Sequence, residues 1–508
     1  MHIIDIRDVS FKFSGSSEPV LKDINLRIGT SEFITLTGPS GCGKSTLCLL
    51  MCGFLPQEGD DFQGTIHLGR QDVRDHSVYQ LSRWIGIVQQ DPEAQLCTLS
   101  VMDEVAFGPE NFLMSEGEIN DKVEWALDVV GAKHLIGRET TNLSGGEKQR
   151  LAIASILALE PKAIIFDEPT SQLDPKGSAQ IFSIITELQR RTDMTIVVVE
   201  HKLRQILPLS SRVVVMDQGR ILVDTPSDQL KEHRSILQSV GVRLPGQDWI
   251  SRPPREENGH DGEILRIEGL HMAYPEGKKV LNGVDLSIRK GEKVGLMGDN
   301  GSGKSTLLLN ILGLEQPKSG KIILDGKDAN RMSMKDRAKT IGFIFQNPNH
   351  QIFESTVIKE VLFATENFGM DATESVERSR KLLESCNIGQ YVERHPYGLS
   401  YGEKRRLNLA SIFIYMPKLL LMDEPFIGQD LNNLNQLMSL TDDFARNGGG
   451  AIMVLHEPEI AEMYCDRLVF LRDGKIVVDE PTSRAFHILR EMGEIEYVPE
   501  VLPNGPRP

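Results

Sequence analysis

The 508-residue sequence has few cysteines, few aromatic residues and no long hydrophobic run. Its six cysteines form no Cys-x-x-Cys pair, which argues against a zinc site and suggests a reducing compartment. No segment approaches the roughly 20 consecutive apolar residues of a membrane-spanning helix. The first residues, MHIIDIRDVSF, lack the basic region and apolar run of a secretory signal. We therefore expect a soluble protein of the cytoplasm.

The sequence also lacks an excess of positive charge. With 72 acidic and 56 basic side chains its formal net charge is −16, which argues against a general nucleic-acid binder because phosphate backbones attract basic surfaces. A hydrophobic fraction of 40% and a charged fraction of 25% are typical of ordinary globular protein. At roughly 100–200 residues per domain, the length predicts more than two compact units.

The strongest positive signal is an internal repeat. GPSGCGKST at 38–46 recurs as GDNGSGKST at 298–306, GIVQQDPEAQL at 86–96 as GFIFQNPNHQI at 342–352, LSGGEKQRLAIAS at 143–155 as LSYGEKRRLNLAS at 399–411, and IIFDEPTSQLD at 164–174 as LLMDEPFIGQD at 420–430. Lys44 and Lys304 are 260 positions apart, and Glu168 and Glu424 are 256 apart. Solenoid repeats run about 20–50 residues, so this period indicates a duplicated domain.

The duplication predicts the domain boundaries. We expect domains at 1–240 and 263–492, joined by a flexible linker at 241–262 that contains three prolines, and followed by a proline-rich tail at 493–508. Within each half, short β-branched runs alternate with helical patterns, as in α/β proteins. The runs 163–166 and 195–199, and their counterparts 419–422 and 451–455, predict buried parallel strands.

Each half contains the phosphate-binding pattern GxxxxGK[ST] between an expected strand and an expected helix. The strands are 33–37 and 293–297. Glycines let backbone N–H groups curl around phosphate oxygens, and the helix adds its positive end. Lys44 and Lys304 are expected to reach the β- and γ-phosphates, and Ser45 and Ser305 to bind Mg²⁺.

An Asp-Glu pair follows a later strand in each half. Asp167 and Asp423 suit the binding of Mg²⁺, and the next residues, Glu168 and Glu424, suit a general base that polarises the attacking water. A single Asp-Glu pair would more often be a solvated loop. The recurrence of strand, pair and proline in the same register favours the catalytic interpretation.

A Ser-Gly-Gly sequence at 144–146 precedes the helical pattern 151–159. Such a segment can cradle an anion at a helix N-terminus, although serine is also an ordinary helix cap.

Together these motifs resemble the ATP-binding-cassette (ABC) ATPases over about nine-tenths of the chain. The resemblance implies an α/β fold of two tandem P-loop NTPase cassettes, each with a RecA-like core, an antiparallel β subdomain and a helical subdomain. It implies that Gln90 and Gln346 are Q-loop glutamines beside Mg²⁺, and that His201 and His456 contact the γ-phosphate. It implies that Phe13 in the first half and Tyr274 in the second stack on adenine, although as isolated aromatics either could equally belong to the core.

The residues expected to bind or hydrolyse Mg²⁺-ATP can be given in full. The catalytic set is Glu168, Glu424, His201 and His456. The nucleotide-binding set in the first half is Phe13, Gly38, Pro39, Ser40, Gly41, Cys42, Gly43, Lys44, Ser45, Thr46, Gln90, Ser144, Gly145, Gly146 and Asp167. In the second half it is Tyr274, Gly298, Asp299, Asn300, Gly301, Ser302, Gly303, Lys304, Ser305, Thr306, Gln346, Ser400, Gly402 and Asp423. The metal-binding set is Ser45, Gln90, Asp167, Ser305, Gln346 and Asp423.

A narrower resemblance points to the ATPases of energy-coupling-factor (ECF) importers, which power uptake of vitamins or of cobalt and nickel ions. It rests on VMDEVAFGPENF at 101–112 and on Gln95 and Gln351, five residues past each Q-loop glutamine. The resemblance implies a peripheral protein on the cytoplasmic face of the cell membrane. Its partners would be an integral membrane coupling protein and a substrate-binding membrane protein. The same residues could instead form a solvated helix and turn in any importer cassette.

In the ABC family, each ATP lies between one P-loop and the signature of the opposite cassette. The second half departs from the pattern in two such segments, with Tyr401 where the first half has Gly145, and FIGQD at 426–430 in place of TSQLD at 170–174. Both departures would fall in the site built on Lys44. We therefore expect the Lys304 site, which pairs with LSGGE and Asp174, to be the more active. Tyr401 could restrict approach to the phosphate, or it could point outward without cost.

Two other functions compete with the ECF interpretation. The nearest is the fused ATPase of a sugar importer, against which 101–112 and the second glutamines count. The other is a soluble twin-cassette ATPase acting on ribosomes or DNA. The linker is short and broken by prolines, and neither zinc cysteines nor very long coiled coils are visible, so the sequence gives no support to this class.

Overall fold

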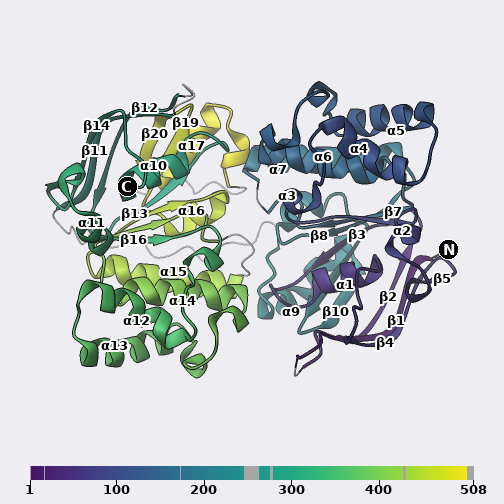
Figure 1. Cartoon of the computed structure of the whole chain (residues 1–508), viewed down its shortest axis with the longest axis horizontal. Coiled ribbons are helices and arrows are strands. Elements are labelled where there is room, and N and C mark those ends of the chain that lie inside the picture. The colour runs from purple at the N-terminus through teal and green to yellow at the C-terminus, as the bar shows by residue number, and fades with distance from the viewer. Residues whose placement is uncertain are drawn as a thin grey trace. The chain divides into compact units, whose positions relative to one another are not determined.

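The chain folds into two units of the same architecture, residues 1–247 and 248–508. The computed structural model describes residues 2–16, 18–171, 173–244, 262–274, 279–426 and 431–499. Most of the expected linker, part of the FIGQD segment (427–430) and the end of the expected tail lie outside the described residues. Each unit contains an antiparallel sheet, a mainly parallel sheet and a set of helices (Figure 1). The expected α/β fold with tandem P-loop cassettes is confirmed.

The first unit is built on two sheets. The antiparallel sheet has the order β2-β1-β4-β5, with β1 His2–Lys12, β2 Leu21–Gly29, β4 Asp61–Leu68 and β5 Gln71–Asp72. The second sheet has the order β10-β9-β3-β8-β7-β6, with β3 Phe33–Thr37, β6 Ile85–Val88, β7 Ala163–Asp167, β8 Thr195–Val199, β9 Arg212–Asp217 and β10 Arg220–Pro226. All neighbours in it are parallel except β9 and β10.

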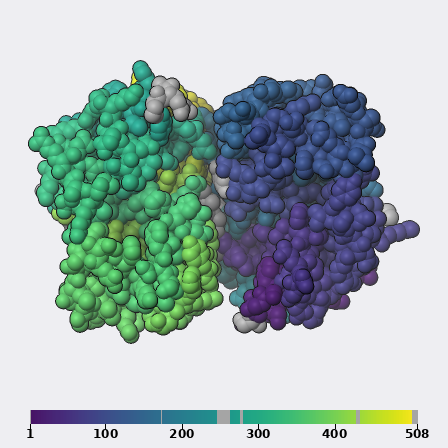
Figure 2. Space-filling view, viewed as in Figure 1, coloured from purple at the N-terminus to yellow at the C-terminus, as the bar shows by residue number. Residues whose placement is uncertain are grey.

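The helices of the first unit fall into two groups. Helices α4 Val101–Asn111, α5 Glu116–Val129 and α6 Gly145–Leu157 pack together as a helical subdomain at the top of this unit in Figures 1 and 2. The other helices are α1 Lys44–Met51, α2 Val78–Leu81, α3 Pro92–Gln95, α7 Pro175–Arg191, α8 Leu203–Ile206 and α9 Arg234–Ser239.

The parallel strands are buried on both faces, which explains their unbroken apolar sequences. In β7, Ile164 and Phe166 belong to the core shared with the helical subdomain, whereas Ala163 and Ile165 belong to the core shared with the antiparallel sheet. The expected strands 163–166 and 195–199 are therefore confirmed, and the alternation along β7 joins two hydrophobic cores.

The second unit repeats this plan. Its antiparallel sheet has the order β12-β11-β14-β15, with β11 Glu263–Ala273, β12 Lys279–Arg289, β14 Ser319–Leu324 and β15 Lys327–Asp328. Its other sheet has the order β16-β17-β18-β13-β19-β20, with β13 Lys293–Met297, β16 Ile341–Ile344, β17 Leu419–Met422, β18 Gly450–Val454, β19 Arg467–Arg472 and β20 Lys475–Pro481.

The helical subdomain of the second unit consists of α12 Val357–Phe368, α13 Ala372–Ser385 and α14 Tyr401–Phe413. The remaining helices are α10 Lys304–Leu312, α11 Met334–Thr340, α15 Leu431–Arg446, α16 Pro458–Tyr464 and α17 Thr482–Glu491. Within the described ranges, no helix is long and apolar enough to cross a membrane.

The topology gathers the expected site residues at one edge of each parallel sheet. In the first unit, β3 ends directly before Gly38, β7 ends at Asp167, and β6 and β8 end two residues before Gln90 and His201. These four strands are parallel, so their carboxyl ends meet at the same edge, where ligands bind in open α/β sheets.

Candidate functional site

The phosphate-binding loop of each unit has a backbone that requires glycine. Gly38 has φ +147°, and a Cβ there would lie 2.0 Å from the carbonyl oxygen of Met216. Gly298 repeats this, with φ +147° and the carbonyl oxygen of Leu471 at 2.1 Å. The loop is therefore pressed against the neighbouring strand end, and any side chain at its first position would displace it.

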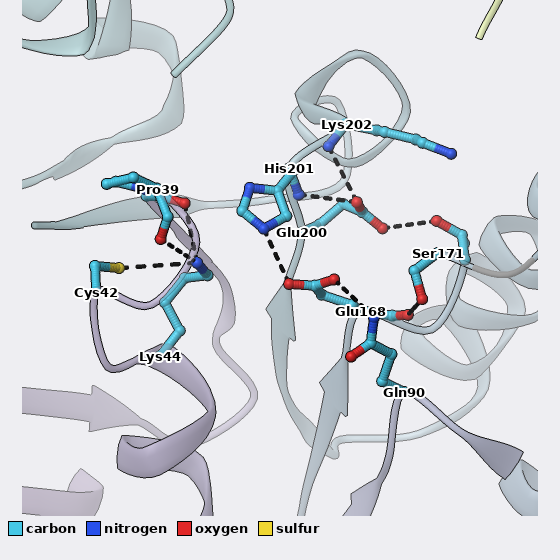
Figure 3. Close-up of polar contacts among 11 residues, drawn as sticks. Pro39, Cys42, Lys44, Gln90, Glu168, Ser171, Glu200, His201 and Lys202 are labelled. Atoms are coloured by element: carbon cyan, nitrogen blue, oxygen red, sulfur yellow. Dashed lines mark hydrogen bonds and ion pairs between the residues drawn. The ribbon is translucent and has the colours of Figure 1, made fainter. Parts of the chain in front are cut away.

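The loop lysines lie at the first residue of α1 and α10, and both are buried. The Lys44 ammonium donates to the carbonyl oxygens of Gly38 at 2.9 Å and Pro39 at 2.8 Å (Figure 3). The Lys304 ammonium donates to those of Gly298 at 2.8 Å and Asp299 at 3.0 Å. Each loop thus encloses a positive charge next to a helix N-terminus, an arrangement suited to phosphate oxygens.

Asp167 and Asp423 form a buried carboxylate position beside the loop. Burial raises the pKa of Asp167 to about 6, although a hydrogen bond with Ser45 opposes that effect. Burial also raises the pKa of Asp423, against a hydrogen bond with Ser305. The Oδ1 atom of each aspartate is buried without a hydrogen-bond partner in the described structure. An unpaired carboxylate oxygen beside a hydroxyl is a pair of hard oxygen ligands of the kind Mg²⁺ prefers, so these residues fit the ion.

Glu168 lies at the centre of a polar cluster with Gln90 and His201. Its Oε1 is 2.9 Å from the Nε2 of His201, and its Oε2 accepts a hydrogen bond from the Nε2 of Gln90 at 3.3 Å. Figure 3 shows both side chains directed at the Glu168 carboxylate. Burial favours the neutral acid, but the hydrogen bond with His201 and the nearby positive charges of His201, Lys44 and Lys202 outweigh it and hold the pKa of Glu168 below its usual value. The carboxylate is therefore ionised at neutral pH.

The second unit reproduces this cluster with shorter contacts. The Oε1 of Glu424 is 2.6 Å from the Nε2 of His456, and its Oε2 accepts from the Nε2 of Gln346 at 2.7 Å. Glu168 and Glu424 share a φ of +48°, a left-handed conformation that is uncommon outside glycine. Strained backbone of this kind concentrates at functional sites, and here it recurs at the same residue of both repeats.

A further pair, Thr170 and Glu200, supports the cluster of the first unit and was not anticipated from the sequence. The buried Glu200 carboxylate accepts hydrogen bonds from the Thr170 hydroxyl at 2.8 Å and from the backbone N–H of His201 at 2.8 Å and Lys202 at 3.0 Å. The second unit has Phe426 and Leu455 at the equivalent positions, both buried. The signal in the sequence that could have revealed this pair is a glutamate, Glu200, directly after the apolar strand β8.

The serines of the signature segments cap helices. The Ser144 hydroxyl accepts from the backbone N–H of Glu147, whose side chain accepts from the N–H of Ser144 in return, and Ser400 makes the same capping box with Glu403. This is the ordinary helix cap that the sequence left open. These serines lie in the helical subdomains, at the start of α6 and α14, and belong to neither glutamate cluster. Gly145 and Gly146 have no atom within 4 Å of an added Cβ, whereas a Cβ on Gly402 would meet Asn433 at 2.8 Å.

The two expected adenine-stacking aromatics differ in their surroundings. Phe13 is 38% exposed and contacts Phe11 edge to face, with ring centroids 4.8 Å apart. Tyr274 is half-buried, and its hydroxyl donates to a Glu315 carboxylate oxygen at 2.9 Å. Phe13 is therefore partly open to solvent, while the ring of Tyr274 packs against the core of the second unit.

Comparison with known proteins agrees with this geometry. The family model described as "ABC transporter" matches residues 21–171 and 281–427. A Methanosarcina mazei protein provisionally named as an ABC transporter ATP-binding protein is 36% identical, covering 94% of this chain and 88% of that protein. A Bacillus subtilis protein provisionally named HMP/thiamine import ATP-binding protein YkoD is 32% identical, covering 99% of this chain and 95% of that protein.

Among solved structures, CbiO1 from Clostridium perfringens, described as part of the ABC transporter complex CbiONQ, is 33% identical, with a TM-score of 0.42 over 48% of this chain and 96% of that one. The family model matches more than half of the chain, in two copies, and the relatives match along nearly its whole length. The chain therefore belongs to the ABC transporter family, as an ATP-binding protein with two cassettes.

Proposed function

We propose that this chain is the ATP-hydrolysing, energy-coupling subunit of an ECF-type importer for a vitamin or a transition-metal ion. The observation that carries the ATPase assignment is the cluster of a glutamate, a glutamine and a histidine, repeated with the same contacts in both units. In each unit it lies at the strand edge that also bears the phosphate-binding loop. The family assignment supplies the transport context.

The phosphates would be held by the backbone N–H groups of 38–46 and 298–306. Lys44 and Lys304 would release their loop carbonyls and donate to phosphate oxygens instead, exchanging a neutral acceptor for a charged one. The start of α1 or α10 adds the positive end of a helix dipole.

Ser45 and Asp167 would hold Mg²⁺ in the first cassette, with Gln90 nearby, and Ser305, Asp423 and Gln346 in the second. The ion, when bound, neutralises charge on the phosphate oxygens. A cation beside Asp167 and Asp423 would also lower their pKa values and so offset the effect of burial, which favours the neutral acid.

Glu168 and Glu424 would accept the proton of the attacking water. The lowered pKa of Glu168 keeps it unprotonated at neutral pH, as a base requires. His201 and His456, through Nε2, fix the rotamer of the carboxylate, and Gln90 and Gln346 fix its other oxygen. Because these contacts already hold the carboxylate in place, the base would not need to reorient on the way to the transition state.

The two cassettes are proposed to pair head to tail within the chain, so that each ATP lies between one P-loop and the opposite signature. On that arrangement the Lys304 site combines with Ser144, Gly145, Gly146 and Asp174, and we propose that it carries most of the turnover. The Lys44 site would face Ser400, Tyr401 and Gly402 and turn over more slowly. ATP-dependent closure would move a membrane partner through the difference in its affinity for the closed and open states.

Three observations favour an ECF-type importer. The segment 101–112 forms α4 and the residue after it, on the helical subdomain. Gln95 braces the Q-loop, since its Oε1 accepts from the N–H of Gln89 at 3.0 Å and its Nε2 donates to the carbonyl of Ile87 at 3.3 Å. The full-length similarity to a protein named for HMP/thiamine import supports uptake of a vitamin-like solute.

The proposal predicts partners that can be captured. The tagged chain, extracted from its own membranes in mild detergent, should retain two integral membrane proteins, one for coupling and one for binding the solute, at the cytoplasmic face. Recovery of ribosomes or DNA without any integral partner would overturn the transporter assignment in favour of the twin-cassette alternative. Two permease subunits with a solute-binding protein would favour the sugar-importer alternative over the ECF type.

A further inference from the structure

The signature helix of the second cassette carries two side chains that the first cassette lacks. Tyr401 and Arg405, one turn apart on α14, occupy the positions of Gly145 and Gln149 on α6. Residues four apart lie on the same face of a helix and can act together. Gly145 belongs to the proposed nucleotide-binding set, and Gln149 does not.

Both side chains reach the Q-loop of their own cassette. The Arg405 guanidinium donates to the main-chain carbonyls of Phe345 and Gln346. The Tyr401 hydroxyl donates to the Gln346 carbonyl at 3.2 Å and accepts from Arg405 at 3.3 Å. The Tyr401 side chain is therefore held by hydrogen bonds within its own cassette and does not project freely outward.

Arg405 is 1% exposed, the largest fully buried side chain among the described residues. Burying a guanidinium costs free energy unless hydrogen bonds compensate it. Here the compensating acceptors are backbone carbonyls of one short loop, so the conformation of that loop and the burial of Arg405 depend on each other. The arginine does more than fill space.

The loop that these residues hold carries the side chain that contacts the proposed base. The main-chain carbonyl of Gln346 accepts hydrogen bonds from Arg405 and Tyr401. The side-chain Nε2 of the same residue donates to Glu424 at 2.7 Å. One residue thus connects the signature helix to Glu424, and Glu424 in turn contacts His456.

The first cassette holds its Q-loop in another way. Gln95 braces it from the downstream side, and the Gln149 Nε2 is buried without a hydrogen-bond partner in the described structure. The contact from Gln90 to Glu168 is longer, at 3.3 Å. In the second cassette the relation is reversed, because the Oε1 of Gln351, the counterpart of Gln95, is the buried atom without a partner.

We propose that Tyr401 and Arg405 form a clamp that positions Gln346, and through it Glu424, in the second cassette alone. They are positioning residues, since they touch the loop and not the reacting atoms. The inference rests on the proposed function in one respect: the signature is taken to contact the nucleotide held by the other cassette. Occupancy of the Lys44 site would then reach Glu424 through the clamp.

The test uses the full chain with Glu168→Gln, so that the remaining hydrolysis reports Glu424. Tyr401→Phe removes one hydroxyl, and Arg405→Gln restores the residue found in the first cassette. Tyr397→Phe is the matched control, because Tyr397 is 53% exposed and lies four residues before Tyr401. Steady-state kcat and KM for ATP are measured, together with amide hydrogen exchange of the peptide 342–351.

Arg405→Gln should lower kcat roughly tenfold and Tyr401→Phe about threefold, with KM little changed, because hydrogen bonds from charged groups are the stronger ones. Exchange of 342–351 should rise in both variants and stay unchanged in the control. An unchanged kcat, or unchanged exchange in Tyr401→Phe, would overturn the clamp. If the Glu168→Gln parent hydrolyses no ATP, the proposed dominance of the Lys304 site fails or the two sites are obligately coupled, and the exchange comparison decides the clamp by itself.

Discussion

Replacing Asp167 by asparagine should make the chain more stable while removing its response to Mg²⁺. Asp167 ends β7 and is 9% exposed, and burial raises its pKa to about 6. At neutral pH the folded protein therefore keeps a carboxylate ionised in surroundings that favour the neutral acid. Asparagine has nearly the same shape and carries no charge, so it avoids that cost.

The size of the effect follows from the pKa. With a pKa of 3.8 in the unfolded chain and about 6 in the folded one, ionisation costs about 3 kcal/mol at pH 7.5, at about 1.36 kcal/mol per pKa unit. Because the folded-state pKa is the higher one, the contribution of this group to stability is fully present below pH 3.8 and is lost as the pH rises through 6. At pH 5 only about half of the cost applies.

Urea unfolding followed by tryptophan fluorescence at pH 7.5 and pH 5 would measure this. Asp167→Asn should raise the unfolding free energy by up to about 3 kcal/mol at pH 7.5 and by about half as much at pH 5. Asp121→Asn, an exposed change on α5, should have little effect at either pH. A less stable Asp167→Asn, or a gain that is the same at both pH values, would refute the reasoning.

The metal arm of the same experiment separates stability from function. ATP with Mg²⁺ should raise the unfolding midpoint of the parent, since a ligand that binds only the folded state stabilises it. Asp167→Asn should lose the part of this increase that depends on Mg²⁺, because an amide is a weaker ligand than a carboxylate. A full Mg²⁺ response in the variant would contradict the role proposed for Asp167.

Three further predictions concern individual contacts. In the assembled transporter, Glu424→Gln should reduce ATPase activity by on the order of 100-fold, because it removes a general base, and Glu168→Gln should reduce it less. A larger loss for Glu168→Gln would contradict the proposed asymmetry. Equal losses would indicate obligate coupling of two competent sites. Glu200→Leu should lower the unfolding free energy by about 1–3 kcal/mol, because it removes the acceptor of Thr170 and of two backbone N–H groups. Adding Thr170→Phe, which restores the apolar pair of the second cassette, should recover part of that loss in urea unfolding. Tyr497→Phe should weaken binding of a fluorescent ATP analogue to the second cassette about threefold, because the buried Tyr497 hydroxyl donates to Asp299 in its phosphate-binding loop at 2.7 Å; Tyr397→Phe, the exposed control, should bind normally.

The sequence was most informative where local rules act. The strands 33–37 and 293–297 and the helix after each P-loop follow from short segments, and the structure has them where expected. The meeting of Gln90, Glu168 and His201 follows from one further rule, the shared edge of parallel strands. The repeat adds an independent check, because the same contacts occur twice.

The supporting contacts were not predictable, because they join residues far apart in the sequence. Tyr497 and Asp299 are separated by 198 positions and Arg405 and Phe345 by 60. No periodicity or motif encodes such pairs, since each depends on how the finished sheets and helices pack. The same limitation applies to Tyr401: the sequence allowed it to restrict approach to the phosphate or to point outward, and neither interpretation included a contact with its own Q-loop.

The two cassettes agree in their chemical groups and differ in what holds those groups in place. Lysine, aspartate, glutamate, glutamine and histidine recur at both strand edges. The backbone at His201 is held by the buried Glu200 carboxylate. In the second cassette the positions of Thr170 and Glu200 are taken by the buried apolar residues Phe426 and Leu455. One Q-loop is braced by Gln95 and the other by Arg405. Because positioning errors of about 1 Å can cost 100-fold in rate, differences in these supports are enough to make two chemically equal sites unequal. Substitutions in the supports should therefore separate the two sites more cleanly than substitutions in the shared catalytic groups.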